Sequence, residues 1–261
     1  MRRPTTAGLY TAGLLLLTAA TGAIDAVSFL ALDGVFTGNM TGNVLFLAFA
    51  LVGVPDIPLL NNAFALLGFA LGSVVGGRLV RRGHPMGLPV RSAWLLGAGT
   101  ALVFVLAGVW ATVGDLDGVG QIIVTAMLAA LMGAQVAAVK PVGNTDITTV
   151  VVTSTLANVT RDSRLGGGRQ TPSQWRHRTF AIVAMGAGAA LGAAVLRVTD
   201  GPVALAASGV VFAAGVAALL VARSAQRRAR TATQTAEVTP PSTPAHATTT
   251  RPTTPISATT P

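Results

Sequence analysis

The sequence predicts an all-α polytopic membrane protein with six transmembrane helices and two short Thr-rich segments that are re-entrant or broken. Of the 261 residues, 51% are hydrophobic and only 10% are charged, whereas a soluble globular domain carries about 25% charged residues. Six separate segments are also long and apolar enough to cross a bilayer, which takes about 20 residues. This composition excludes an ordinary soluble enzyme, and it excludes disorder over most of the length.

The expected spans follow one another along the chain and leave two shorter apolar segments between them. The spans are Leu9–Leu32, Asn61–Val80, Ser92–Val113, Val119–Val139, Thr179–Leu196 and Pro202–Ala222. The shorter segments, 37–54 and 147–159, are interrupted by Thr, Asn or Ser. A cleaved signal peptide is the alternative for the first span, but its apolar stretch is longer than that of a typical signal sequence.

The basic residues decide whether the two shorter segments cross. Arg residues gather at the N-terminus, at 78–91, at 161–178 and at 223–230, and short cytoplasmic loops of membrane proteins collect Arg and Lys. Eight crossings would place the 78–91 cluster outside, whereas two re-entrant segments place every cluster inside. We therefore expect six crossings, with the N-terminal residues 1–8 and the C-terminus in the cytoplasm.

The two halves of the membrane region, 9–113 and 119–222, resemble each other. Each half has a Gly-Ala pair, a Thr-containing triplet, a Phe-Ala pair and two Gly residues spaced four apart. In the first half these are Gly22-Ala23, Thr41-Gly42-Asn43, Phe64-Ala65, Gly72 and Gly76, and in the second half they are Gly133-Ala134, Thr153-Ser154-Thr155, Phe180-Ala181, Gly188 and Gly192. Three crossings per half is an odd number, so the pattern predicts an inverted 3+3 repeat, which is common in transporters. Chance similarity between Ala-, Gly- and Leu-rich sequences is the alternative.

The stretch from Asp33 to Asn43 is the most informative part of the chain. Its three Gly residues permit unusual backbone conformations, and its Thr and Asn side chains supply hydrogen-bond donors and acceptors. At membrane depth, non-helical backbone survives only when it is buried in protein or lines water. The segment is therefore suited to face a polar solute or ion, or it is a loop whose Asn and Thr cap helix ends.

The sequence here resembles a known family. Gly22–Phe29, followed by Phe36-Thr37 and by Asn39–Asn43, is similar to the YoaK-like family of bacterial inner-membrane proteins, which is catalogued as a domain of unknown function. The resemblance extends over residues 8–222 and includes the second Thr-rich segment, Thr148–Leu156, in which Ser154 stands where a Gly is usual. It implies a polytopic protein of the bacterial cytoplasmic (inner) membrane with about six spans, and it implies no substrate or activity.

Asp25 is the only acidic residue inside an expected span. An ionisable group at membrane depth is costly and commonly faces a cavity, a partner or a proton path; the alternative is that Asp25 reaches water at the nearby outer interface. Gln135 lies near the corresponding point of the second half and is a candidate partner. The candidate substrate-binding residues are Asp25, Thr37, Asn39, Thr41, Gly42, Asn43, Gln135, Thr149, Thr153 and Thr155.

Glycines spaced four apart predict close helix packing, because small residues let helix backbones approach in a membrane. They are Gly68, Gly72 and Gly76 in the first half and Gly188 and Gly192 in the second half. These faces can pack within the chain or between copies, so the pattern leaves a homo-oligomer open.

The sequence contains few residues that are suited to catalysis or to metal binding. The chain has no Cys and three His, and no motif for a metal, a phosphate or a nucleophilic triad is present, so we expect no enzyme activity, no metal and no cofactor. The net charge of +9 comes from Arg residues that lie mostly at the expected cytoplasmic ends of the spans. It therefore does not predict nucleic-acid binding. The expected partners are the lipid bilayer and, at Arg223–Arg230, anionic lipid. Residues 223–261 form a cytoplasmic tail that is first basic and then, from 231, Thr/Pro-rich and disordered.

These features together predict a small-solute or ion transporter or channel with a polar site at the membrane midplane. Both Thr-rich segments would contribute to that site, the first from outside and the second from inside. The alternative is a non-transporting membrane scaffold or accessory subunit, in which the Asn39–Asn43 segment only fixes a helix junction.

Overall fold

The computed structural model describes residues 5–80, 86–143, 152–163 and 166–238, and within these ranges every regular element is a helix. Residues Met1–Gln226 form one compact unit, and Arg227–Pro261 form a second. The predicted all-α class is therefore confirmed. The helices are α1 (Thr6–Ala31), α2 (Met40–Leu51), α3 (Leu59–Leu79), α4 (Val90–Val113), α5 (Gly118–Val139), the 3-10 turn η1 (Lys140–Val142), α6 (Val152–Arg161), α7 (Pro172–Val198) and α8 (Gly201–Val238).

Six of these helices are long and apolar enough to cross a membrane, and they coincide with the six predicted spans. The largest difference in a span's first residue is at α7, which starts at Pro172 and not at Thr179. The earlier start has a local cause. The Thr171 side chain accepts from the Gln174 backbone while the Gln174 side chain accepts from the Thr171 backbone, and Pro172 occupies the first turn. This capping box satisfies the free N–H groups of a helix start.

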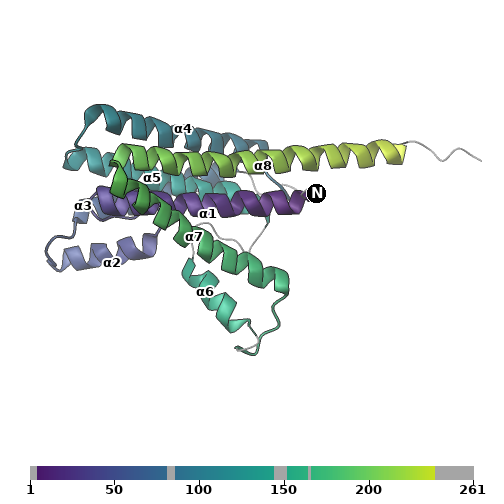
Figure 1. Cartoon of the computed structure of the whole chain (residues 1–261), viewed down its shortest axis with the longest axis horizontal. Coiled ribbons are helices and arrows are strands. Elements are labelled where there is room, and N and C mark those ends of the chain that lie inside the picture. The colour runs from purple at the N-terminus through teal and green to yellow at the C-terminus, as the bar shows by residue number, and fades with distance from the viewer. Residues whose placement is uncertain (1–4, 81–85, 144–151, 164–165, 239–261) are drawn as a thin grey trace, which may run out of the picture. The chain divides into compact units, whose positions relative to one another are not determined.

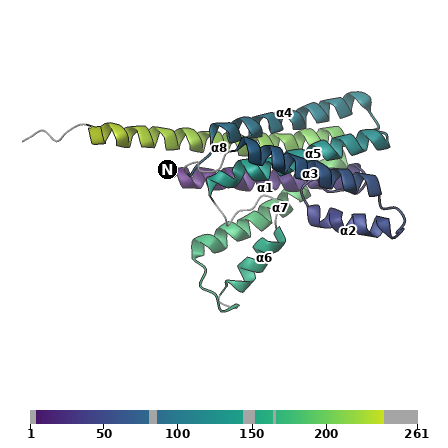
Figure 2. The same cartoon turned by 180° about the vertical axis from the view of Figure 1, so that it is seen from behind.

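Consecutive long helices run in opposite directions (Figure 1, Figure 2). The connections at one end of the bundle, which we call the Asp-rich end, carry Asp33, Asp56, Asp115, Asp117 and Asp200. The connections at the other end, which we call the Arg-rich end, join α3 to α4 and α5 to α7. Helices α1, α4 and α7 start at the Arg-rich end, and α3, α5 and α8 start at the Asp-rich end.

Helices α1 and α5 form the centre of the bundle. In their most apolar windows 61% and 56% of the residues are buried, compared with 17% in α7. Large apolar side chains of the central helices, such as Leu17, Ile24, Leu128 and Met132, are almost completely enclosed and share one core with Phe212 of α8. The outer faces of the other helices carry exposed Leu, Val and Phe, as expected for surfaces that meet lipid.

Two helix pairs approach most closely through glycine. In the α1–α7 pair, a Cβ at Gly188 or Gly192 would collide with the carbonyl of Ala19 or Ala23, and a Cβ at Gly22 would collide with that of Met185. Small residues at these points allow backbone-to-backbone packing.

The α3–α5 pair is packed in the same manner. A Cβ at Gly68 or Gly72 would collide with the carbonyl of Ala126 or Ala130. A Cβ at Gly133 would collide with the carbonyl of Phe69, and Gly76 lies against Ala134. All five glycines that the sequence singled out therefore face neighbouring backbone within the chain.

The predicted disordered tail is wrong for residues 231–238, which belong to helix α8. After Gly215 the sequence holds no Gly or Pro until Pro240, so nothing in that interval interrupts the helix. The helix ends two residues before Pro240, as expected because a proline disfavours helical geometry in the residue that precedes it. The rest of the predicted tail, 239–261, lies outside the described residues.

Candidate functional site

A stripe of buried polar residues runs along one face of α1. Thr18, Thr21, Asp25 and Ser28 follow one another at three- and four-residue intervals, and none is more than 5% exposed. This spacing places side chains on a single helix face. Of these four residues only Asp25 stood out in the sequence; the heptad-like spacing of the hydroxyl residues around it is the signal that indicates the other three.

The carboxylate of Asp25 binds the loop that follows α1. Its Oδ1 accepts from the backbone N–H of Thr37 at 2.9 Å, from the Thr37 hydroxyl at 2.9 Å and from the backbone N–H of Gly38 at 2.7 Å. A Cβ at Gly38 would lie 2.9 Å from the Thr21 methyl group and 3.3 Å from Asp25 Oδ2. Asp25 therefore holds the loop against α1, at a point where glycine leaves just enough room.

The loop reaches Asp25 because the chain reverses direction at the end of α1. Asp33 and Gly34 both have positive φ, +44° and +67°, a conformation that Gly, Asn and Asp adopt most readily. The Ser28 hydroxyl then donates to the carbonyl of Val35 at 2.6 Å. The segment 33–39 thus runs back along α1 toward the Arg-rich end.

Helix α2 carries the chain back toward the Asp-rich end. The amide of Asn43 accepts from the Phe36 N–H at 3.0 Å and donates to the Phe36 carbonyl at 2.6 Å, and Asn43 is the only buried residue of α2. The Asn39 side chain caps the helix by accepting from the Gly42 N–H. With 12 residues, α2 is about 18 Å long, which is shorter than the roughly 30 Å hydrocarbon core of a bilayer.

Gln135 joins α5 to the polar stripe. Its side-chain nitrogen donates to the Thr21 hydroxyl at 3.2 Å, and that hydroxyl donates to the carbonyl of Leu17. Gln135 is 1% exposed, and its Oε1 has no hydrogen-bond partner among the described residues. A buried acceptor without a partner is costly, so this oxygen is a candidate contact for a bound polar group.

Four predicted site residues therefore gather at one place: Asp25, Thr37, Asn43 and Gln135. Gly42 is half-buried at the start of α2, and Asn39 and Thr41 are exposed.

The second Thr-rich segment does not join this group within the described residues. Thr155 is buried and Thr153 exposed on α6, which packs against α7, whereas α2 packs against α3. Both views place α2 and α6 in different parts of the bundle (Figure 1, Figure 2). Thr149 lies outside the described residues.

The Asp-rich end is closed by hydrogen bonds close to the end of the stripe. Asn61 at the start of α3 donates to Asp33 Oδ2 at 2.5 Å. Gln121 at the start of α5 also donates to the Asp33 carboxylate when its amide nitrogen is turned toward it. Asp33 thus ties together the end of α1 and the starts of α3 and α5.

The Arg-rich end is hollowed between the starts of α1 and α7. A cavity of about 470 Å³ is lined by Tyr10, Thr11, His177, Gly87 and Gln226, among others. The Tyr10 hydroxyl donates to Gln226 Oε1 at 2.7 Å and accepts from the Leu88 N–H at 3.2 Å. These hydrogen bonds join the start of α1 to the segment before α4 and to α8.

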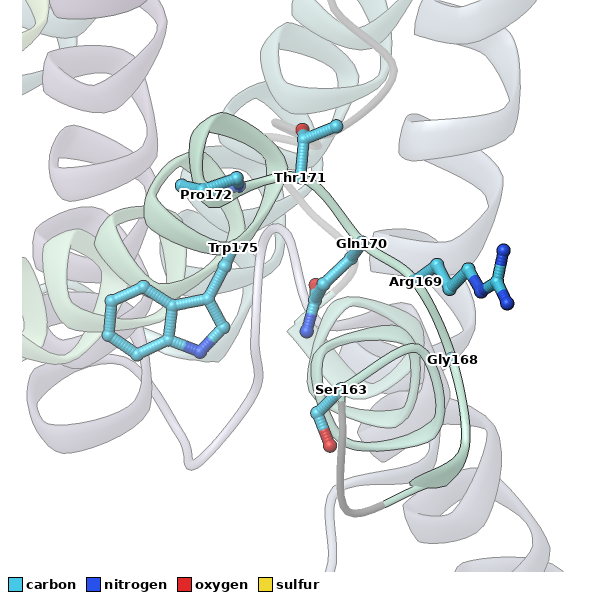
Figure 3. Close-up of a pocket in the computed structure, with 7 residues that line it drawn as sticks. All are labelled: Ser163, Gly168, Arg169, Gln170, Thr171, Pro172 and Trp175. Atoms are coloured by element: carbon cyan, nitrogen blue, oxygen red, sulfur yellow. The ribbon is translucent and has the colours of Figure 1, made fainter.

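A second hollow at the Arg-rich end, of about 590 Å³, lies between the α6–α7 loop and the start of α7 (Figure 3). Trp175 and Gln170 line it, and the Arg169 side chain points away from Trp175. Asp162 fixes this loop through ion pairs with Arg161 at 2.9 Å and Arg178 at 2.8 Å. Hydrogen bonds from Arg161 and Arg178 lower the pKa of Asp162 below its ordinary value.

Six long apolar helices with a buried polar stripe define a multi-pass membrane protein. Residues 13–222 match the family DUF1275, described as a protein of unknown function, and the chain belongs to that family. It is also 31% identical over 151 residues to the UPF0700 transmembrane protein YoaK of Bacillus subtilis (strain 168). That alignment covers 57% of this chain but only 64% of the relative. The resemblance to YoaK-like proteins is thus confirmed. No solved structure matches the chain.

Proposed function

We propose that the protein is a transporter or channel for small polar solutes or ions, built from an inverted 3+3 repeat. The observation that carries the proposal is the equivalence of the two glycine-packed helix pairs. In the repeat, α1 corresponds to α5 and α3 corresponds to α7. The first span of each half packs against the second span of the other half.

The equivalence extends to individual contacts. Gly188 faces the carbonyl of Ala19 in one pair, and its counterpart Gly72 faces the carbonyl of Ala130 in the other. Ala19 lies three residues before Gly22, as Ala130 lies three residues before Gly133. Chance similarity between Ala- and Gly-rich sequences would not match the atoms that touch, so this agreement favours a repeat.

Two further pairs of contacts are also equivalent under the repeat. Gly192 faces the carbonyl of Ala23, and Gly76 lies against Ala134. Gly22 faces the carbonyl of Met185, and Gly133 faces that of Phe69. Met185 lies five residues after Phe180, as Phe69 lies five residues after Phe64. Two such interfaces of opposite orientation let one half rock against the other, which is how inverted-repeat transporters expose a central site alternately.

The solute site in this proposal is built on the side chains of Thr21 and Gln135, which are buried in the centre of the bundle. The unpartnered Oε1 of Gln135 is a hydrogen-bond acceptor, and Asp25 supplies a carboxylate one turn further along α1. Acceptors of this kind suit a cation or a neutral solute that carries N–H or O–H groups. The site needs no catalytic residue and no cofactor.

The membrane orientation is part of the proposal. The Arg-rich end faces the bacterial cytoplasm, because short cytoplasmic loops collect Arg and Lys, and both termini lie on that side. The segment 33–51 then enters from outside as a loop and returns as α2. The arginines of α8 from Arg223 to Arg230 meet anionic lipid headgroups.

Flux through purified protein in proteoliposomes tests this function. The probes are potassium ion, glycerol, urea and a neutral amino acid, each compared with protein-free vesicles. We expect at least one probe to move faster with the wild type, and we expect Gln135→Leu and Thr21→Val to reduce that flux. Thr100→Val is the matched control, because the Thr100 hydroxyl donates only within its own helix, to Leu96. If every probe crosses the proteoliposomes no faster than it crosses protein-free vesicles, the result would contradict transport.

A scaffold or accessory role is the second candidate, and one observation favours it. The loop 36–38 itself supplies the hydrogen-bond partners of Asp25 Oδ1 and of the Asn43 amide. Those two residues can therefore serve the helix junction alone. Full flux with Asp25→Asn and Asn43→Ala would assign them to the junction while leaving transport through Gln135 intact.

A further inference from the structure

The carboxylate of Asp25 has no cationic partner within the described part of the chain. None of the hydrogen bonds and ion pairs of these residues joins it to an Arg, Lys or His. Helices α2 and α5 hold no ionisable residue, and the basic residues of α3 and α7 lie at the Arg-rich end, apart from Arg197, which is exposed. A charge removed from water is costly unless it is paired, so one bound positive charge would balance the centre of the bundle.

The loop after α1 covers this carboxylate. The Thr37 hydroxyl and the N–H groups of Thr37 and Gly38 all donate to Oδ1 of Asp25, at 2.7 to 2.9 Å. Gly38 also lies over the second oxygen, because a Cβ there would be 3.3 Å from Oδ2. An oxygen that accepts three hydrogen bonds has no lone pair left for a cation. The loop and a cation would therefore compete for the same carboxylate.

The residues beside the carboxylate offer further oxygen atoms. Thr21 precedes Asp25 by one turn on the same face of α1, and the buried Oε1 of Gln135 has no hydrogen-bond partner among the described residues. Hard cations take carboxylate, hydroxyl and carbonyl oxygens as ligands. A single carboxylate balances a single positive charge, which favours a monovalent alkali cation over a divalent one.

The same loop closes the way to this site from the Asp-rich end. Val35 is completely buried in a small apolar cluster with Ala65 of α3 and Ala129 of α5. Ala65 lies four residues after Asn61, so the cluster is about one helix turn deeper than the hydrogen bond between Asn61 and Asp33. An apolar side chain thus fills the position between the end of the bundle and the polar stripe.

We infer that the solute is a monovalent alkali cation that competes with the loop for the carboxylate of Asp25, and that its binding releases Val35 and opens the site toward the Asp-rich end. The inference rests on the proposed function, because it names the solute of that same site. Without a cation, the donors of Thr37 and Gly38 satisfy the carboxylate and hold Val35 between α3 and α5. The cation binds the state in which the loop has left Asp25, and it shifts the equilibrium toward that state.

Binding of radioactive sodium and rubidium ions to the purified protein tests the competition. The wild type should bind at least one of the two ions saturably, and Asp25→Asn should bind neither. Thr37→Val removes one donor to the carboxylate and keeps the side-chain shape. It should tighten binding about tenfold, because the cation then displaces one fewer hydrogen bond to a charged group. Ser28→Ala should tighten binding in the same direction, because it removes the 2.6 Å hydrogen bond that holds the Val35 carbonyl but none to Asp25.

The matched controls are Thr100→Val and Ser208→Ala, whose hydroxyls donate only within their own helices. Both should bind the ion as the wild type does. A loop that only supported the fold would not tighten binding when it is weakened. Weaker or unchanged binding in both Thr37→Val and Ser28→Ala would therefore overturn the competition, as would the absence of binding in the wild type.

Release of Val35 is measured by the reaction of Val35→Cys with a membrane-impermeant maleimide in lipid nanodiscs. The natural chain has no Cys, so the introduced thiol is the only target. Replacing N-methylglucamine chloride by the chloride of the bound ion, at equal ionic strength, should raise the rate by about tenfold or more, as expected when a minor state becomes the major one. Leu205→Cys, which is completely buried on α8, should react slowly in both salts. An unchanged rate at Val35→Cys, or an equal rise at Leu205→Cys, would overturn the release.

Flux is measured separately, so the two proposals fail in different ways. Competitive binding and release of Val35 without flux would overturn transport alone. Flux of a neutral probe without cation binding would overturn the inference alone, and so would cation flux that Asp25→Asn leaves intact.

Discussion

Asp25 accepts two hydrogen bonds from Thr37, one from its backbone N–H and one from its hydroxyl, each at 2.9 Å. The two residues are separated by the end of a transmembrane-length helix and a reversal of the chain. A carboxylate that is costly to bury is thus used to hold a loop inside the bundle, where its backbone N–H groups would otherwise lack partners.

The first prediction concerns this attachment. Asp25→Ala leaves the N–H groups of Thr37 and Gly38 without their acceptor, and each buried unpaired group costs about 1–3 kcal/mol. We expect the midpoint of thermal unfolding in detergent to fall sharply. Asp25→Asn retains a side-chain oxygen and should fall less. Equal loss in both variants would mean that the charge, and not the acceptor, stabilises the loop.

The second prediction concerns the clamp between Asn43 and Phe36. Asn43→Leu removes both hydrogen bonds to the Phe36 backbone and should destabilise the segment 36–43 by about 1–3 kcal/mol. Faster proteolysis within this segment is the measurement. Thr41→Ala is the control, because Thr41 is exposed on the same helix and its replacement should have little effect. Protease resistance in Asn43→Leu equal to the wild type would contradict the clamp.

The third prediction uses pairs of glycines on the same helix. A Cβ at Gly188 would collide with backbone, whereas one at Gly186 would meet nothing within 4 Å; Gly72 and Gly77 form the same contrast on α3. Alanine at Gly188 or Gly72 should cost about 1–3 kcal/mol through overpacking.

Alanine at Gly186 or Gly77 should instead stabilise by up to about 1 kcal/mol, because alanine favours the helix. Unfolding midpoints of the four variants in detergent provide the comparison. Equal midpoints within either pair would mean that the α1–α7 or α3–α5 approach is looser than described.

The fourth prediction is a pH dependence at the α6–α7 loop. Because Arg161 and Arg178 lower the pKa of Asp162, the ion pairs are fully present above the ordinary carboxylate pKa of about 4. Their contribution is lost as the pH falls through the lowered pKa. Fluorescence of Trp175, in a variant with Trp94→Phe and Trp110→Phe, should therefore change in acid below about pH 4. Asp162→Asn should abolish that transition, and its persistence would assign it to another group.

Much of the fold could be predicted because its determinants are local. Apolar runs of about 20 residues identify spans, and all six coincide with observed helices. The start of α7 was missed because a capping box, not hydropathy, determines it. The helix through residues 231–238 was missed because a Thr-rich composition suggested disorder, although nothing in it interrupts a helix.

The site was predicted only in part because it depends on contacts that are distant in sequence. Asp25 and Asn43 stood out as polar residues in apolar surroundings. The Thr37 hydroxyl, which donates to Asp25, was also among the predicted site residues. The other partners did not stand out, because they are backbone groups of Phe36, Thr37 and Gly38. The pairing of Gln135 with Thr21 joins residues more than a hundred positions apart. Sequence spacing offered Asp25 as the candidate partner of Gln135, whereas the structure pairs it with Thr21, one turn earlier on α1.

The most direct test of the central claim is the sidedness of Thr5 and Asp56 in intact cells. The claim is that α2 returns to the side from which its loop entered, because only then are the two halves inverted. Single cysteines at these positions, in a chain without native Cys, report their side to an impermeant maleimide. Because α1 is then the only crossing between them, we predict that Asp56→Cys reacts from outside and that Thr5→Cys reacts only after permeabilisation. Reaction of both cysteines from the same side would mean that α2 crosses the membrane, and it would contradict the repeat and the proposed transport pathway together.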